Sequence, residues 1–243
     1  ITSTAGITVG SLDIGHGLGG DVSNAAVGYG ALDESISSTV RCTAIGQLAL
    51  GELKHPSQDN TAVGSAALQE LIGHFAGATG EDNTAVGSYA LQTTTQGLRN
   101  TAVGMSAMKS GDCANDNTAV GNLALKVFTG SSATAVGSGA ADVAGSQTNL
   151  TAIGSNALGV ATSGNSNTAV GVSALLTVDG ADNTAVGVAA LGADCVNDNT
   201  AVGRAALLAF TGSNATAVGS GAATAATSAT GLTAVGYNAL GAC

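Results

Sequence analysis

The chain contains few aromatic and few charged residues. Of its 243 residues, 2% are aromatic and 9% are charged, and it has no Trp and one Pro. Ordinary globular proteins carry about 25% charged residues and about 7% Gly, whereas this chain has 37 Gly. Its apolar residues are mostly Ala, Val and Leu. Any core must therefore be thin, closely packed and built without large side chains.

The low content of basic residues also restricts the classes of partner. Six Lys and Arg stand against sixteen Asp and Glu, for a net charge of -10, so the surface would repel phosphate backbones and we expect no nucleic-acid partner. No run of about eighteen apolar residues is free of Gly or polar interruptions, so we expect no membrane insertion. An apolar fraction of 44% argues against disorder, which combines low hydrophobicity with high net charge.

One short phrase, Asn-Thr-Ala-Val-Gly or a close relative, recurs along almost the whole chain. Ala stands two residues before the Gly of each clear copy, Val or Ile one residue before it, and Ala again three residues after it, usually followed by Leu. The Gly residues of these copies are Gly28, Gly46, Gly64, Gly87, Gly104, Gly121, Gly137, Gly154, Gly171, Gly187, Gly203, Gly219 and Gly236. The repeating unit is about 17 residues long, which is typical of a repeat architecture.

This period fits neither a heptad nor the longer helical repeats, and each unit contains a β-prone Thr-Ala-Val run closed by Gly. The sequence therefore predicts an all-β fold, a parallel β-solenoid of about 13–14 coils with roughly 17 residues per coil, stacked at about 4.8 Å. Residues 1–20 are expected to be an N-terminal cap or degenerate first coil, and 21–243 a single continuous solenoid. This solenoid carries an 82-residue internal duplication, 113–159 with 195–241, and a loop or helical-turn insertion near 69–82.

The alternation of side chains along a strand places Thr and Val on one face and Ala on the other. If both Ala positions of the repeat pointed inward, more than about twenty Val and Leu side chains would be left outside, more apolar surface than a monomer normally exposes. We therefore expect Val and Leu to face the core and the invariant Ala residues to lie outside. Close contact with another copy of the chain would then explain why those positions are always Ala.

Three copies of the repeat, DNTAVGSYAL (82–91), LTAIGSNAL (150–158) and NTAVGVAAL (183–191), carry a resemblance to known proteins. They resemble the repeats of bacteriophage and large-virus tail-fibre or appendage proteins, and are more distantly similar to the heads of YadA-like trimeric autotransporter adhesins. The resemblance implies a β-roll in a homotrimer or filament, with a structural or adhesive role. It further implies an extracellular, cell-surface or virion location, with a host-surface glycan or protein as a further partner.

We find no pattern typical of an enzyme and expect neither a cofactor nor a metal. Gly15, Gly17 and Gly20 satisfy G-x-G-x-x-G, but no helix is expected after them, so a Gly-rich cap is favoured over dinucleotide binding. The three histidines, His16, His55 and His74, belong to different coils or loops. A polysaccharide-active solenoid enzyme would need clustered acidic and basic groups, and the basic residues are scattered. The main alternative to a fibre is an ice-binding solenoid, in which Thr-x-Val columns would form a flat, regular face.

Acidic residues precede the Asn of several phrases. In stacked coils they would form a solvated turn beside a ladder of Asn amide hydrogen bonds, and a weak Ca²⁺ site is the alternative. The residues are Asp59, Asp82, Asp116, Asp182 and Asp198.

The four cysteines are Cys42, Cys113, Cys195 and Cys243. Cys113 and Cys195 occupy equivalent positions five coils apart, or about 24 Å at the strand spacing. A disulfide needs Cα atoms within about 7 Å, so these two cannot pair within one solenoid. Free thiols and inter-subunit disulfides involving the four cysteines both remain open.

Overall fold

The computed structural model describes residues 7–9, 12–16, 21–33, 39–52, 57–70, 80–93, 97–111, 113–161 and 163–241. Over these ranges the chain is all-β, with short strands and no helix. Consecutive coils run parallel to one another, and equivalent residues such as Thr101 and Thr118 lie about 17 positions apart. The predicted fold class, a parallel β-solenoid, is confirmed. The chain forms two compact units, Ile1–Leu123 and Ala124–Cys243, called here the N-terminal unit and the C-terminal unit.

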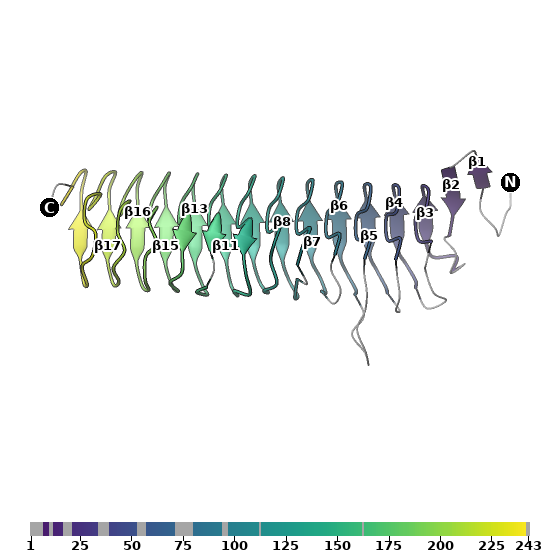
Figure 1. The fold of residues 1–243 in the computed structure, drawn as a ribbon, viewed down its shortest axis with the longest axis horizontal. Coiled ribbons are helices and arrows are strands. Elements are labelled where there is room, and N and C mark those ends of the chain that lie inside the picture. The colour runs from purple at the N-terminus through teal and green to yellow at the C-terminus, as the bar shows by residue number, and fades with distance from the viewer. Residues whose placement is uncertain are drawn as a thin grey trace. The chain divides into compact units, whose positions relative to one another are not determined.

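The N-terminal unit begins with two antiparallel strands and continues as parallel coils (Figure 1). β1 (Ile7–Val9) pairs with β2 (Leu12–Gly15), and β2 pairs with β3 (Ala25–Val27). The parallel strands that follow β3 are β4 (Thr43–Ile45), β5 (Thr61–Val63), β6 (Thr84–Val86), β7 (Thr101–Val103) and β8 (Thr118–Val120). The hairpin of β1 and β2 falls within the proposed cap, residues 1–20.

The C-terminal unit contains two parallel sheets. The strands of the first are β9 (Thr134–Val136), β11 (Thr151–Ile153), β13 (Thr168–Val170), β15 (Thr184–Val186), β16 (Thr200–Val202), β17 (Thr216–Val218) and β18 (Thr233–Val235). The second is formed by β10 (Val143–Ala144), β12 (Val160–Ala161) and β14 (Thr177–Val178). In the first sheet the register places Thr on Thr, Ala on Ala, and Val or Ile on its counterpart at each step.

The prediction of one continuous solenoid over 21–243 stays a prediction, because the chain divides into two compact units. Most of the insertion expected near 69–82 lies outside the described residues.

The interior of the coils contradicts one expectation from the sequence. Leu faces the core as predicted, and Leu91 and Leu158 are fully buried. The prediction that Val also faces inward is wrong for the Thr-Ala-Val strands, because their central Ala is buried and the flanking Val is half-exposed, as in β7 and β15. The second Ala, three residues after Gly, is also inside, as Ala107 shows.

Steric space explains this reversal. Most coils already place a Leu inside, and most add the buried Asn that precedes Thr. A narrow, closely packed interior leaves room on the strand for a methyl group but not for a second column of larger side chains. The small volume of Ala therefore decides which face of the strand turns inward, against the cost of exposing Val.

Two local features hold the coils in register. Gly104 has φ +134°, and a Cβ placed there would lie 2.5 Å from the carbonyl oxygen of Gly121 in the next coil. Only Gly fits this corner, as the repeat pattern indicates. Leu91 and Leu158 also adopt left-handed backbone angles, with φ 48° and 49°, a conformation that is uncommon for Leu.

The predicted ladder of Asn side chains is confirmed and lies inside the coils. The backbone N–H of Asn83 donates to Oδ1 of Asn60 at 2.9 Å, and that of Asn100 donates to Oδ1 of Asn83 at 3.0 Å. The amide Nδ2 of Asn83 donates to the carbonyl of Gly97 at 2.8 Å. The C-terminal unit repeats the pattern, where the N–H of Asn199 donates to Oδ1 of Asn183 at 3.0 Å. These bonds satisfy buried polar groups that would otherwise destabilise a dry interior.

Candidate functional site

The outward side chains of the Thr-Ala-Val strands form a continuous surface on each unit, called here the Thr/Val face. In the N-terminal unit it comprises the outward residues of β3 to β8, and in the C-terminal unit those of β9, β11, β13 and β15 to β18. The parallel register stacks Val103 on Val120, and Val186 on Val202. Each column therefore advances by one strand spacing, about 4.8 Å, per coil.

The Thr/Val face is uncharged and partly apolar. The strands that form it contain only Thr, Ala, Val and Ile. In both units most Val side chains of this face are 37–39% exposed, as at Val103, Val136 and Val218, and Thr101 and Thr184 are half-buried. A row of half-exposed Val over successive coils is an ordered apolar stripe, and a large stripe of this kind marks an interaction site.

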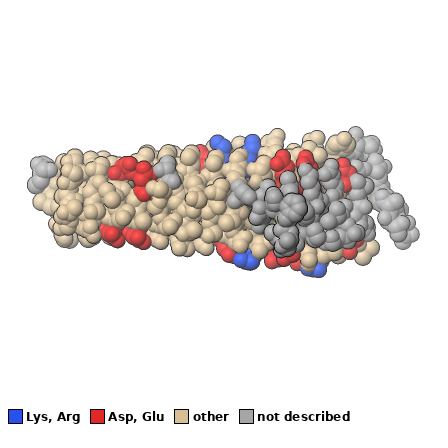
Figure 2. All heavy atoms as spheres, turned by 60° about the horizontal axis from the view of Figure 1, so that its bottom comes forward, with Lys and Arg blue, Asp and Glu red and all other residues tan. Residues whose placement is uncertain are grey.

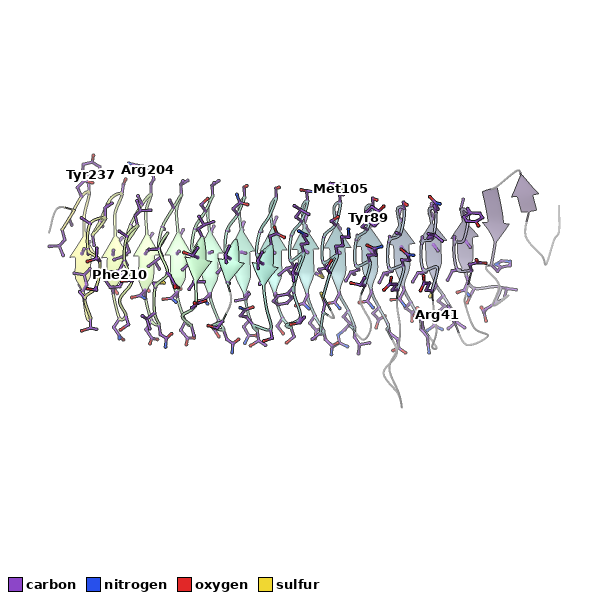
Figure 3. The ribbon with its side chains drawn as sticks, viewed as in Figure 1. Arg41, Tyr89, Met105, Arg204, Phe210 and Tyr237 are labelled. Carbon is purple, nitrogen blue, oxygen red and sulfur yellow. The ribbon has the colours of Figure 1, made fainter. Side chains whose placement is uncertain are left out.

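The two edges of this face differ in chemistry. In the N-terminal unit, Tyr89 and Met105 lie at one edge and Arg41 at the opposite edge (Figure 3). The edge with Arg41 is the turn two residues before Thr, where Arg41, Asp59 and Asp82 have left-handed angles of φ 55–58°. Charged residues therefore lie at the border of the Thr/Val face and not within it.

Two of the predicted turn aspartates are paired with arginines of the neighbouring coil. Nε and Nη2 of Arg41 each donate to Asp59 at 2.7 Å, and Arg99 donates to Asp116 at 2.6 and 2.9 Å. The bonds from each guanidinium lower the pKa of its aspartate below the ordinary value. Both pairs are exposed, so each contributes little to stability.

The prediction of a simple solvated turn missed these pairs. Arg41 and Arg99 occupy the same position of the repeat as the aspartates, and this shared position was the signal that could have revealed them. On the face shown in Figure 2, acidic and basic side chains form small groups separated by uncharged surface.

The described residues hold no group of three or more His, Cys, Asp or Glu side chains arranged to bind a metal ion. His16 lies at the N-terminal end, where its Nδ1 is 2.8 Å from the carbonyl oxygen of Asn24. His55 and His74 fall outside the described residues, as do Gly17 and Gly20 of the Gly-rich pattern. Gly15 ends the antiparallel strand β2, and the described part of the chain contains no helix that could complete a dinucleotide site.

Three of the four cysteines are buried within the coils, and Cys243 is outside the described residues. Cys42 takes the ladder position of Asn, and its backbone N–H donates to Oδ1 of Asn24 at 2.9 Å. Burial raises the pKa of the Cys195 thiol to about 11. The buried positions of Cys42, Cys113 and Cys195 do not favour inter-subunit disulfides, which stay a prediction.

The proposed contact between copies through the Ala columns is contradicted. Ala102, Ala119 and Ala135 have no exposed surface, because they fill the interior of the coils. Packing inside one chain therefore explains why these positions are always Ala, and any contact between copies has to use a different face.

Nowhere in the described part of the chain is there a helix long and apolar enough to cross a membrane. A scan against protein-family models, a search of curated proteins and a search of solved structures each returned no match. The resemblance to tail-fibre and YadA-like repeats accordingly stays a prediction.

Proposed function

We propose that the chain is a non-enzymatic structural segment of an extracellular fibre or surface appendage, on a cell or a virion, and that it assembles with copies of itself through the Thr/Val face. The observation that carries this proposal is the uncharged, half-exposed Val column that runs over successive coils. A homotrimer or a filament would cover this column, and the repeat resemblance supports the same kind of assembly.

The energetics of the face favour association only when many coils contribute. Complete burial of a Val side chain is worth about 1.5–3 kcal/mol, so covering the 38% that Val136 or Val186 exposes adds roughly 0.6–1 kcal/mol per coil. Seven coils of the C-terminal unit would add roughly 4–7 kcal/mol, near the lower end of the cost of association, about 4–15 kcal/mol. A long, uninterrupted face is therefore needed, and the repetition of Val or Ile in every coil of the unit provides it.

A second copy is the partner that fits this face best. Both copies have the same rise per coil, so their Val and Thr columns can stay aligned over every coil. A globular partner has no such spacing and would meet the face over only a few coils. The absence of charge on the strands also removes the repulsion that two identical charged faces would suffer.

The test is the native mass of the chain and of two matched double variants. Val136→Lys with Ile153→Lys places charges on the face, whereas Ser138→Lys with Ser155→Lys places them at exposed positions beyond the Gly corner of the same coils. We expect an oligomer for the wild-type chain, a dissociation constant at least about tenfold higher for the face variant, and an unchanged oligomer for the control. A wild-type chain that sediments as a monomer at micromolar concentration contradicts the proposal.

A second candidate function is ice binding, which is favoured by the outward direction of both Thr and Val. The face then offers hydroxyl and methyl groups at a regular spacing to an ordered water layer. A monomeric chain that shows thermal hysteresis, with loss of the hysteresis in the Val136→Lys variant, would select this function over self-assembly.

A further inference from the structure

The position directly after the corner Gly varies from copy to copy and is mostly exposed. In the N-terminal unit we call these residues the Gly-edge row: Tyr29, Gln47, Ser65, Ser88, Met105 and Asn122. The neighbouring Ala positions are invariant because they fill the interior of the coil, and the Gly position because a Cβ there would meet the next coil. Packing inside the coil does not restrict the row in this way, and the row includes two large exposed side chains, Tyr29 and Met105.

The row is held on a rigid backbone. The carbonyl of Tyr29 accepts the N–H of Leu48 at 2.9 Å, and the carbonyl of Gln47 accepts the N–H of Ala66 at 2.8 Å. The carbonyl of Ser65 continues this ladder by accepting the N–H of Tyr89 at 2.9 Å. The side chains of the row therefore start from positions that are fixed relative to one another, as a binding surface requires.

Two exposed aromatic rings and one exposed Met side chain lie in the row or next to it. Tyr29 is 60% exposed, Tyr89 is 41% exposed and Met105 is 56% exposed. Tyr89 lies one residue beyond the row, and Nζ of Lys109 stands 4.7 Å from the centroid of its ring, which helps to orient the ring. Tyr89 and Met105 lie along the same edge of the unit (Figure 3).

The chemistry of the row fits a neutral polyhydroxyl ligand. Tyr combines a flat apolar ring with a hydroxyl, which suits the apolar face and the hydroxyl groups of a pyranose. Gln47 and Ser65 stand between the two aromatic rings and add an amide and a hydroxyl for hydrogen bonds. Tyr29 and Tyr89 belong to coils three strand spacings apart, or about 14 Å. This span favours an oligosaccharide over a single sugar.

We infer that the Gly-edge row of the N-terminal unit, together with the adjacent Tyr89, binds a neutral oligosaccharide, which stacks on Tyr29 and Tyr89 and is hydrogen-bonded between them by Gln47 and Ser65. The row lies beyond the Gly corner, outside the Thr/Val face. Binding there does not depend on self-assembly.

Calorimetric titration of the full chain tests this inference. The probes are neutral hexasaccharides of β-1,4-linked glucose, mannose and N-acetylglucosamine and of α-1,4-linked glucose, with hexagalacturonate as an anionic comparison. We expect saturable binding of at least one neutral probe. Tyr29→Ala and Tyr89→Ala should each weaken it at least about fivefold, whereas Tyr237→Ala, an equally placed residue of the C-terminal unit, should leave it unchanged.

Three results overturn the inference: no neutral probe binds, only hexagalacturonate binds, or binding persists unchanged in both the Tyr29 and the Tyr89 variants. Circular dichroism of each variant checks that the β-structure is intact, which the exposure of these rings leads us to expect. Sedimentation of the same samples reports self-assembly separately, so failure of one proposal is distinguishable from failure of the other.

Discussion

Glutamine substitutions on the two faces of one strand test which face is interior. In β15, Ala185 has no exposed surface and Val186 is 38% exposed. Ala185→Gln inserts a longer polar side chain among the Ala and Leu residues of the coil. Val186→Gln, one residue later, places the same side chain in solvent and serves as the matched control.

The expected difference between the two variants is large. Overpacking a close-packed interior costs about 1–3 kcal/mol, and a buried amide left without a partner costs about 1–3 kcal/mol more. Ala185→Gln should therefore lower the free energy of unfolding by about 2–6 kcal/mol. For a chain of this size, Tm falls by about 2–4 °C per kcal/mol, which corresponds to roughly 4–24 °C. An exposed substitution such as Val186→Gln stays within about 0.5 kcal/mol.

Thermal unfolding followed by circular dichroism at several protein concentrations separates folding from assembly. Stability gained by oligomerisation depends on concentration, so a loss of Tm in Val186→Gln that varies with concentration reports the Thr/Val face as an interface. The loss in Ala185→Gln should be present at every concentration. If Val186→Gln is the more damaging variant at low concentration, or if the two variants are equal there, the assignment of inner and outer faces is wrong.

Three further predictions concern the corner, the ion pairs and the thiols. Gly104→Ala should lower the free energy of unfolding by at least about 1–3 kcal/mol, because its Cβ would meet the carbonyl oxygen of Gly121; a denaturant midpoint equal to that of the wild type would contradict the corner geometry. The bonds from Arg99 lower the pKa of Asp116 in the folded chain, so the pair stabilises above the ordinary Asp pKa of about 3.9 and loses its effect as pH falls through the lower folded pKa. The Tm difference between wild type and Asp116→Asn should accordingly shrink from pH 6 towards pH 2, and a difference that is constant with pH would rule out this linkage. Burial raises the pKa of Cys195 to about 11, so iodoacetamide at pH 8 should label it much more slowly in the folded chain than in denaturant, as measured by mass spectrometry, and equal rates would show that the thiol is accessible.

Much of the fold could be predicted because a solenoid is a local structure. Each coil contacts only the coils before and after it, so the constraints recur at every period and appear in the sequence as fixed Ala, Gly and Leu positions. The Asn ladder followed from the same logic, since Asn residues stacked in register let each Oδ1 accept the backbone N–H of the next Asn. The candidate functional site, the Thr/Val face, was harder to predict from the sequence. The invariant positions of the repeat, such as Ala102 and Ala119, mark where variation is restricted. They do not say whether the restriction acts inside a chain or between chains.

The sequence by itself determined the period, the parallel stacking and the division of each strand into a Thr/Val face and an Ala face, because these depend on spacing and on the alternation of side chains along a strand. Only the tertiary structure decided which of these faces is interior. That choice depends on the width of the coil, where Leu91 and Asn83 are already buried. The alternation of side chains along a strand does not reveal this width. The pairing of Arg99 with Asp116 and the left-handed angle of Leu91 likewise depend on the path of the chain between strands, which brings residues from successive coils together.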